Sequence, residues 1–492
     1  MSISKTIHKV ICYFIRISGR KKYFYSFLYG VVLMFAMPPF FFLPCLFVFA
    51  LFYLQIDLAK DKKDAFYLGW FFGFGYFVTG LYWVSSSLLV DPLKFAWLIP
   101  FAVSLIPAIS AIFVGVAAII TFLVPEKGWP RIVLFSIFWV SFEMIRGILT
   151  QFPWSFIGYS WVFSDNISQI AYIFNVYGLG VLAVLFGTIP ASLIYISREH
   201  NVITFLQDKR PIILVLLLVI TSYLYGIYHI DDSDKNNRET IKVKVVQGNI
   251  EQLAYTSRDK RLDNFLRHID LTTTGEKDSD IIVWPESAVP FVLDEEEDLK
   301  KIIGKTLPEK SILITGAVRK EGTYGKDDFK YWNSMNFING EGEIYKFYNK
   351  SILVPFGEFV PFSKVLGFID KITEGLADFS SGDGVKVIKS LNDRVSIIPI
   401  ICYEAVFPEY LMRLKGKIKN GLIVNVTNDA WFGTTIGPYQ HFYMSKVRAI
   451  ELGSPMVRAA NTGISGVFDK YGRELKRIGL NQKGVIDVEI KY

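Results

Sequence analysis

The sequence predicts a multi-span α-helical membrane domain followed by an α/β domain outside the membrane. Of the 492 residues, 51% are hydrophobic, and the apolar residues are concentrated in the first half. From about 23 to 230 the chain is nearly continuous apolar sequence, and charged residues return at an ordinary density from Asp231 onward. The polar segment DDSDKNNRET at 231–240 is typical of a linker. We therefore expect a membrane domain at 1–230 and a second domain at 241–492.

The first half holds apolar stretches that are long enough to cross a bilayer, which takes about 20 residues per helix. About seven spans are expected, at roughly 23–38, 39–56, 65–88, 95–124, 132–148, 167–197 and 211–230. The core of a soluble protein is the alternative. It is disfavoured because PIILVLLLVITSYLYGIYHI, at 211–230, is apolar on every face of a helix rather than on one.

Basic residues indicate how these spans are oriented. Lys and Arg gather in the N-terminal segment and in alternate loops, whereas the other loops carry essentially Lys94 alone. Because positive charge marks the cytoplasmic side, we expect the N-terminus in the cytoplasm. After seven spans, the second domain lies on the periplasmic side of a bacterial inner membrane.

The region 241–492 alternates strand-like and helix-like segments. Strands are expected at 241–250, 280–286, 311–319, 395–404, 421–429 and 484–492, hairpins at 331–347 and 465–477, and helices at 258–273, 409–415 and 439–452. This alternation predicts a layered α/β domain with a substantial sheet.

Three of the expected strands end near reactive side chains: Glu286, Lys350 and Cys402. Cys402 is the only one of the three cysteines in the second domain, so it has no partner there for a disulfide. A thiol reacts as the thiolate, and with a free pKa of about 8.5 it needs a base or a nearby cation. A carboxylate can accept the proton, and a lysine can stabilise an oxyanion. The three residues together would suit acyl transfer.

Other chemistries have weaker support in the sequence. A Cys–His pair would have to use His268 or His441, because the other histidines lie in or near the membrane half. There is no G-x-S-x-G elbow of a serine hydrolase. No Cys, His and Asp cluster has metal-ligand spacing, and no glycine loop is suited to phosphate. We therefore expect neither a metal nor a cofactor.

Three motifs carry a family resemblance: VWPESAVP at 283–290, YNKSILVPFGEFVP at 348–361 and ICYEAVFPE at 401–409. Together they resemble the carbon–nitrogen hydrolase, or nitrilase, superfamily, which implies an α-β-β-α sandwich with a Glu–Lys–Cys triad. With the apolar first half, and with FPWSFIGYS at 152–160 and NVTNDAWFG at 425–433, the resemblance narrows to the bacterial apolipoprotein N-acyltransferases.

The resemblance implies roles for particular residues. Glu286 matches the general base, Lys350 the oxyanion-stabilising lysine and Cys402 the nucleophile. Supporting active-site residues are matched by Glu358, Tyr403 and Glu404. The alternatives that the residue types leave open are an ion pair or cap for Glu358, core packing for Tyr403 and an exposed turn for Glu404.

The implied reaction has two steps. The cysteine takes an acyl chain from a membrane phospholipid as a thioester, and the free α-amine of a diacylglyceryl-cysteine on an apolipoprotein then accepts that chain. The alternative is a membrane-tethered amidase or nitrilase that uses water as the acceptor. The expected partners are phospholipid, apolipoprotein and bilayer, with a monomeric enzyme and no nucleic acid.

Further positions are expected to shape the pocket or to face lipid. Asn428 and Trp431 would line the pocket, and Trp154 would lie at the membrane interface. Leu366 and Phe368 belong to a segment, 364–379, that could form a lid dipping into lipid or an ordinary packed helix.

Two departures from the family pattern are visible. Where the family usually has a Lys-Trp pair after VQGNI, this sequence offers Tyr255. The family also usually ends with an eighth membrane helix, whereas a strand is expected at the end of this chain, at 484–492.

Overall fold

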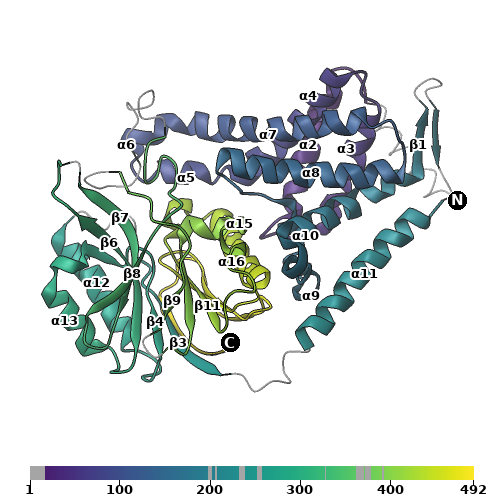
Figure 1. Cartoon of the computed structure of the whole chain (residues 1–492). Helices are drawn as coiled ribbons and strands as arrows, with labels where there is room; N and C mark the ends of the chain where they lie inside the picture. Colours follow the sequence, from purple (N-terminus) through teal and green to yellow (C-terminus); the bar gives the residue numbers. More distant parts are fainter. Residues whose placement is uncertain are drawn as a thin grey trace. The chain divides into compact units, whose positions relative to one another are not determined.

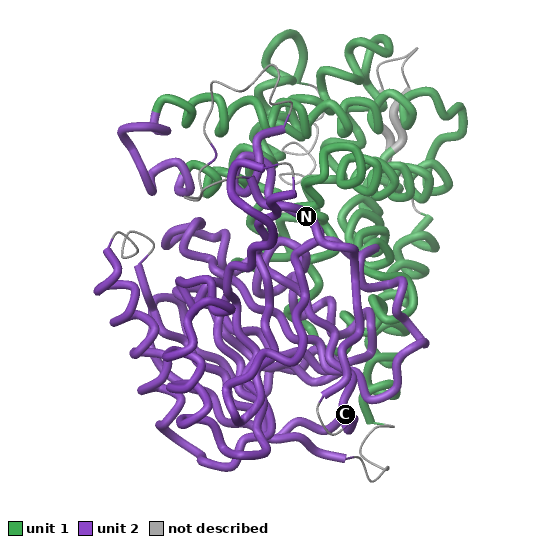
Figure 2. Tube along the Cα trace, turned by 60° about the vertical axis from the view of Figure 1, so that its left-hand side comes forward, with its two compact units in different colours: residues 1–85, 97–233 green, residues 86–96, 234–492 purple. Residues whose placement is uncertain are grey.

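The computed structural model describes residues 17–197, 202–205, 208–231, 239–251, 257–326, 328–361, 371, 378–390 and 393–492. The chain divides into two compact units, Met1–Ser85 with Trp97–Ser233, and Ser86–Ala96 with Asp234–Tyr492 (Figure 2). The first unit is helical apart from a small hairpin, and the second contains two β-sheets with helices (Figure 1).

The helical unit consists mainly of apolar helices. They are α2 (Lys21–Leu33), α3 (Val48–Asp57), α4 (Lys62–Leu81), α7 (Ile99–Leu123), α8 (Trp129–Thr150), α10 (Ile170–Thr188) and α11 (Arg210–Asp231). Helix α4 begins where the Asp61 side chain accepts a hydrogen bond from the backbone N–H of Asp64. Two glycines allow α2 and α4 to pack closely, because a Cβ on Gly30 would lie 1.9 Å from the Phe72 carbonyl oxygen and one on Gly75 would lie 2.1 Å from that of Phe27.

Within the described residues, four helices are long and apolar enough to cross a membrane: Pro92–Leu123, Trp129–Thr150, Ile170–Leu193 and Arg210–Asp231. They coincide with the last four expected spans. The expected span at 39–56 contains a shorter apolar helix, Leu43–Asp57, and the spans at 23–38 and 65–88 contain α2 and α4. The total of seven spans therefore stays a prediction. The end of the expected span at 167–197 is wrong, because Ile194–Ser197 forms strand β1, paired with β2 (Val202–Phe205).

Two charged side chains on α8 form hydrogen bonds with the segment that follows it. Glu143 accepts hydrogen bonds from Trp139 Nε1 and from the backbone N–H of Ile157, each at 3.0 Å. Arg146 donates to the carbonyl oxygens of Phe152 and Trp154. Because an unpaired polar group is costly in an apolar surrounding, these bonds hold the loop against α8.

The second unit is built on two stacked sheets. One has the order β14-β13-β12-β11-β10-β9, and the other has the order β15-β3-β4-β6-β7-β8, with β5 beside β6. The strands are β3 (Thr240–Gln247), β4 (Ile281–Val283), β5 (Val289–Val292), β6 (Ile312–Glu321), β7 (Lys330–Ile338), β8 (Ile344–Asn349), β9 (Ile388–Lys389), β10 (Ser396–Ile401), β11 (Gly421–Thr427), β12 (Met456–Ala460), β13 (Ser465–Phe468), β14 (Glu474–Ile478) and β15 (Gly484–Lys491).

The core between the sheets is apolar and joins both of them. One continuous cluster includes Val243 and Ile314 from one sheet with Ile397 and Val424 from the other. The outer face of the β3–β8 sheet packs against α12 (Arg258–Thr272) and α13 (Glu297–Thr306). On the other sheet, α16 (Gly437–Leu452) places Phe442 4.9 Å from Phe468 of β13, measured between ring centroids. The expected α-β-β-α sandwich is confirmed (Figure 1).

The expected strand at 395–404 ends earlier than its apolar pattern predicts. Strand β10 stops at Ile401, and Cys402–Val406 forms a short 3-10 helix, η8. The reason is local, because Cys402 has a φ of 49°, which is incompatible with an extended strand. The short strands β5, β9 and β12 were not expected, since short apolar runs carry little periodicity. Helix α13 was not expected either, although its buried residues Leu299 and Ile303 have helical spacing.

Candidate active site

Three residues from different strand ends meet inside the second unit. Glu286 follows β4, Lys350 directly follows β8 and Cys402 directly follows β10. Strands β4 and β8 belong to one sheet and β10 to the other, so the stacking of the sheets brings these residues together. Lys350 Nζ lies 3.7 Å from Glu286 Oε1, and the Cys402 thiol is close enough to both side chains for their charges to affect its pKa. All three side chains are buried.

Glu286 is held on both of its oxygens. Asn333 Nδ2 donates to Oε1 at 2.7 Å, and the backbone N–H of Asn428 donates to Oε2 at 2.8 Å. The same Asn333 nitrogen also donates to Glu358 Oε1 at 2.9 Å. The two carboxylates are therefore fixed by a shared amide, which leaves each of them little rotational freedom.

Lys350 is anchored mainly by Glu358. Its Nζ lies 3.0 Å from Oε1 and 2.9 Å from Oε2 of Glu358, and Oε2 also accepts from the backbone N–H of Val354. Glu358 thus forms an ion pair, as one of its two alternatives predicts. Its partner is Lys350, the lysine of the site itself.

Burial and nearby charges set the protonation of this cluster. Burial alone would lower the pKa of Lys350, but the carboxylates of Glu358 and Glu286 raise it above its ordinary value. Burial raises the pKa of Glu286, and Lys350 only partly offsets this effect. Burial and the neighbouring Glu286 raise the pKa of the Cys402 thiol. The resting site thus holds a protonated thiol, a charged lysine and a carboxylate with increased proton affinity.

Glu404 is buried and accepts hydrogen bonds from the segments that carry Lys350 and Cys402. Its Oε1 accepts from the Tyr348 hydroxyl and from the Ser351 backbone N–H, each at 2.7 Å, and its Oε2 accepts from the backbone N–H of Ile401 at 2.7 Å. One carboxylate therefore links the residue after Lys350 to the residue before Cys402. The exposed-turn alternative for Glu404 is wrong, because its side chain is fully buried.

The remaining expected residues lie in varied places. Tyr403 is buried with its ring edge-to-face against Phe407, at 5.2 Å between centroids. Asn428 caps the 3-10 helix η9 (Asp429–Phe432), which contains the half-buried Trp431. Asn428 thus approaches Glu286 through its backbone, whereas its side-chain oxygen accepts from the N–H of Ala430 at 3.3 Å.

One expectation is corrected and three fall outside the described residues. Trp154 does not face lipid: its side chain is fully buried and packs against Trp83 and Phe152 within the helical unit. An aromatic residue in a loop beside a span has the composition of an interface residue, and only packing reveals that it is internal. Tyr255, Leu366 and Phe368 lie outside the described residues.

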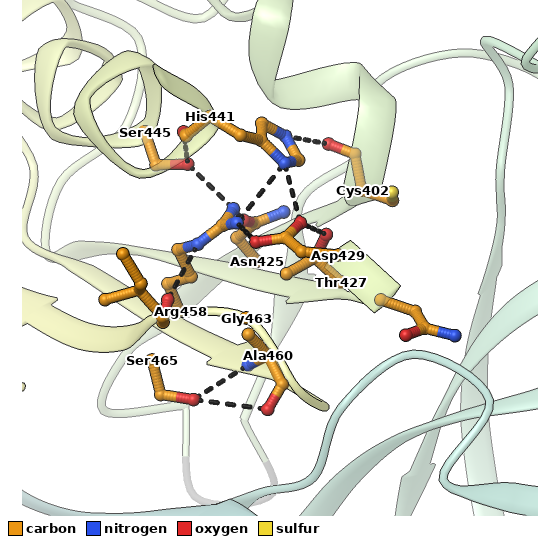
Figure 3. Close-up of polar contacts among 12 residues, drawn as sticks. Cys402, Asn425, Thr427, Asp429, His441, Ser445, Arg458, Ala460, Gly463 and Ser465 are labelled. Atoms are coloured by element: carbon orange, nitrogen blue, oxygen red, sulfur yellow. Dashed lines mark hydrogen bonds and ion pairs between the residues drawn. The ribbon is translucent and has the colours of Figure 1, made fainter. Parts of the chain in front are cut away.

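Sequence reasoning missed several residues that contact the site. Asn333 is one polar residue within the strand KYWNSMNFI, and Tyr348 and Ser351 flank Lys350 without any signal beyond their polarity. His441, considered above as a partner for the thiol, instead faces the Cys402 backbone. Its Nε2 lies 3.1 Å from the carbonyl oxygen, and the Cys402 sulfur points away from the ring (Figure 3).

Comparison with known proteins covers both halves of the chain. Residues 29–189 match the family model described as the apolipoprotein N-acyltransferase N-terminal domain, and residues 242–492 match the model for carbon-nitrogen hydrolase. An apolipoprotein N-acyltransferase of Rhizobium rhizogenes is 38% identical, over 95% of this chain and 90% of that protein. One from Rickettsia prowazekii is 35% identical, over 92% of this chain and 89% of that protein.

A solved structure, a carbon-nitrogen hydrolase from Helicobacter pylori, is 16% identical, covers 52% of this chain and 90% of that chain, and has a TM-score of 0.38.

Proposed function

Because the chain belongs to the apolipoprotein N-acyltransferase family, we propose that it moves a fatty acyl chain from a membrane phospholipid to an apolipoprotein. The acceptor is the N-terminal α-amine of a diacylglyceryl-cysteine, and Cys402 carries the acyl chain between the two as a thioester. The observation that supports this mechanism most directly is the buried meeting of Cys402, Glu286 and Lys350.

In the first step, Glu286 accepts the proton of the Cys402 thiol as the sulfur attacks the ester carbonyl carbon of the phospholipid. The negative charge that forms on the carbonyl oxygen is stabilised by the Lys350 ammonium. The ester C–O bond then breaks, Glu286 returns the proton to the leaving oxygen, and a lysophospholipid departs. The acyl chain stays on sulfur.

In the second step, the acceptor amine attacks the thioester carbonyl carbon. Glu286 takes a proton from the attacking nitrogen, and Lys350 again stabilises the oxyanion. The C–S bond breaks, and the sulfur leaves with the proton from Glu286 as a thiol. The amide product is released, and each residue returns to its starting state.

The observed electrostatics suit these roles. A base should have its pKa near the working pH, and burial raises the pKa of Glu286 in that direction. An oxyanion stabiliser should stay charged, and Glu358 helps to keep Lys350 protonated. Glu358 and Asn333 would then act by holding the base and the lysine in register.

Both proposed substrates are anchored in lipid, which accounts for a helical unit with apolar, membrane-length helices. We propose that the enzyme is a monomer of the bacterial inner membrane, with its N-terminus in the cytoplasm and residues 241–492 on the periplasmic side. The charge distribution of the loops supports this orientation.

Intact mass spectrometry of the purified full-length protein, supplied with phospholipid vesicles, tests the mechanism. We expect a fatty-acyl adduct on Cys402 that hydroxylamine removes. Cys402→Ser should abolish this hydroxylamine-sensitive adduct, whereas Cys45→Ser, which changes a buried cysteine of the helical unit, should retain it. A wild-type protein that never carries the adduct would refute the thioester mechanism.

The acceptor is tested separately, by adding a diacylglyceryl peptide with a free N-terminus to the acylated enzyme. We expect an N-acyl peptide to appear as the adduct disappears. Free fatty acid without N-acyl peptide would instead identify the hydrolase alternative, in which water is the acceptor.

A further inference from the structure

Behind Cys402 lies a buried histidine–aspartate–arginine network (Figure 3). His441 on α16 places Nε2 3.1 Å from the Cys402 carbonyl oxygen and Nδ1 2.9 Å from Asp429 Oδ1. Arg458 on β12 donates from Nη2 to Asp429 Oδ2 at 2.6 Å. All three side chains are fully buried, and they come from three different elements that converge on one backbone atom of the nucleophile candidate.

The direction of the hydrogen bond to Cys402 follows from the chemistry of the two atoms. A carbonyl oxygen only accepts, so His441 Nε2 carries a hydrogen and donates it. His441 Nδ1 also lies 3.2 Å from Arg458 Nη2. Nδ1 can therefore donate to Asp429 when the ring is charged, or accept from Arg458 when the ring is neutral. In both cases Nε2 remains the donor to Cys402.

The far end of the network is fixed by the sheet and by α16. Arg458 Nη1 donates to Asn425 Oδ1 at 2.6 Å and to Ser445 Oγ at 3.0 Å, and its Nε donates to the Ile464 carbonyl oxygen at 3.2 Å. Despite burial, which raises the pKa of Asp429, the Arg458 guanidinium lowers it to about 2. The carboxylate thus stays charged and holds the Arg458 guanidinium beside Nδ1 of the imidazole ring.

The Cys402 carbonyl oxygen, which accepts the bond from His441, belongs to a residue with an unusual backbone conformation. Cys402 has a φ of 49°, a conformation that non-glycine residues adopt only when their surroundings enforce it. The direction of its carbonyl oxygen is set by ψ of Cys402, so a donor on that oxygen restrains the residue on its C-terminal side. On the N-terminal side, Glu404 accepts from the N–H of Ile401. The strained residue is therefore held from both directions.

We propose that His441 is a positioning residue for Cys402. By donating to the Cys402 carbonyl oxygen it keeps the backbone in the strained conformation that directs the thiol at Glu286 and Lys350. Asp429 and Arg458 hold the ring in turn. The inference rests on the proposed function in one respect, since it takes Cys402 as the nucleophile, and it adds a residue that touches neither thiol nor substrate.

Two substitutions of His441 test the contacts of its two ring nitrogens one at a time. In His441→Gln the amide nitrogen occupies about the place of Nε2 and can still donate to the Cys402 carbonyl oxygen. In His441→Asn the shorter amide reaches only the place of Nδ1, so the contact with Asp429 can persist while the bond to Cys402 is lost. If His441 had only a structural role, the Gln variant would not be more active than the Asn variant.

The measurements are made on the full-length enzyme in phospholipid vesicles. Single-turnover formation of the Cys402 acyl adduct gives the maximal acylation rate and the half-saturating donor concentration, which are written here as kcat and KM for the donor. Alkylation of Cys402 by iodoacetamide gives thiol reactivity without any lipid substrate. The matched control is His268→Gln, which replaces a second buried histidine of the same unit, one that contacts the Asn264 carbonyl oxygen on α12.

We expect His441→Asn to lower kcat about 100-fold with KM within about twofold, because a small displacement of a reacting group is enough for such a loss. His441→Gln should recover most of that loss, and alkylation should follow the same order. His268→Gln should leave kcat unchanged. Ser445→Ala keeps the ring but removes one support of Arg458, and should lower kcat about threefold, which provides a milder test if His441→Asn does not fold.

Equal kcat values for the Gln and Asn variants, corrected for the folded fraction, would overturn the proposal, as would a loss seen in KM alone. Unchanged kcat in Ser445→Ala would do so where His441→Asn cannot be purified. Failure of the proposed function gives a different result: no acyl adduct forms in any variant, yet alkylation of Cys402 still falls from wild type to Gln to Asn.

Discussion

Lys350 Nζ lies 2.9 Å from Oε2 of Glu358, and this carboxylate stands eight residues later in the chain. Glu286 is farther from the same nitrogen, at 3.7 Å. The lysine is therefore anchored by one glutamate, which leaves the other available to accept a proton from the thiol. Without this difference in distance, both carboxylates would pair equally with the Lys350 ammonium.

The first prediction concerns that anchor. Glu358→Gln removes a negative charge that raises the pKa of Glu286, so Lys350 turns toward the base and the pKa of Glu286 falls. We expect acyl-adduct formation to slow about 100-fold, and its acidic midpoint to move to lower pH. Rapid-quench mass spectrometry measures both. Glu341→Gln, at an exposed turn, is the control, and a Glu358→Gln enzyme with wild-type rate and midpoint would contradict the prediction.

The second prediction is the pH dependence of the wild-type enzyme. Glu286 must be ionised to accept the thiol proton, and burial raises its pKa. The rate should therefore be lost as pH falls through a midpoint above the ordinary glutamate value of about 4.3. The pH profile of single-turnover acylation checks this, with vesicle binding measured in parallel at each pH. A midpoint at or below the ordinary value would mean that another group limits the rate.

The third prediction uses two tyrosines of strand β8. Tyr348→Phe removes the hydroxyl that donates to Glu404 and leaves a buried carboxylate with one donor fewer. It should destabilise the protein by about 1–2 kcal/mol. Among the described residues, the Tyr345 hydroxyl is buried and has no hydrogen-bond partner, so Tyr345→Phe should be neutral or slightly stabilising. Thermal unfolding in detergent compares the two variants, and equal Tm changes would argue against Glu404 as an anchor.

The fourth prediction concerns stability and pH. Burial lowers the pKa of His268 from 6.5 to about 4. A histidine whose folded-state pKa is lowered contributes full stability above its unfolded pKa, and that contribution is lost as pH falls from about 6.5 toward 4. Between pH 7.5 and pH 5 the loss should be about 2 kcal/mol. Chemical unfolding at the two pH values measures it, and His268→Gln should show a correspondingly smaller dependence.

Much of the architecture follows from local pattern. The length and apolarity of the first half predicted membrane helices, and four of them meet the criteria of length and composition within the described residues. The hairpin at 331–347 and the helix at 258–273 were predicted from short-range signals and are present as β7–β8 and α12. Glu286, Lys350 and Cys402 were found because both strand ends and reactive side chains can be recognised from the amino-acid sequence alone.

The surroundings of the site could not be obtained in that way. Asn333 lies 47 residues from the glutamate it holds, and His441 lies 39 residues from the cysteine whose backbone it contacts. Their polarity alone does not distinguish them from other polar residues in buried elements. Trp154 was misjudged for the same reason, since composition cannot tell an interfacial aromatic from one packed inside a helical unit.

The sequence by itself therefore determined the two-part organisation, the principal strands of the second unit and the three reactive residues, because these depend on periodicity and on neighbours along the chain. Only the tertiary structure decided how the residues act on one another. The stacking of two sheets brings their strand ends together, burial and nearby charges together set the direction of each pKa shift, and a strained Cys402 is held by Glu404 on one side and His441 on the other. These effects depend on distances through space, which no local pattern encodes.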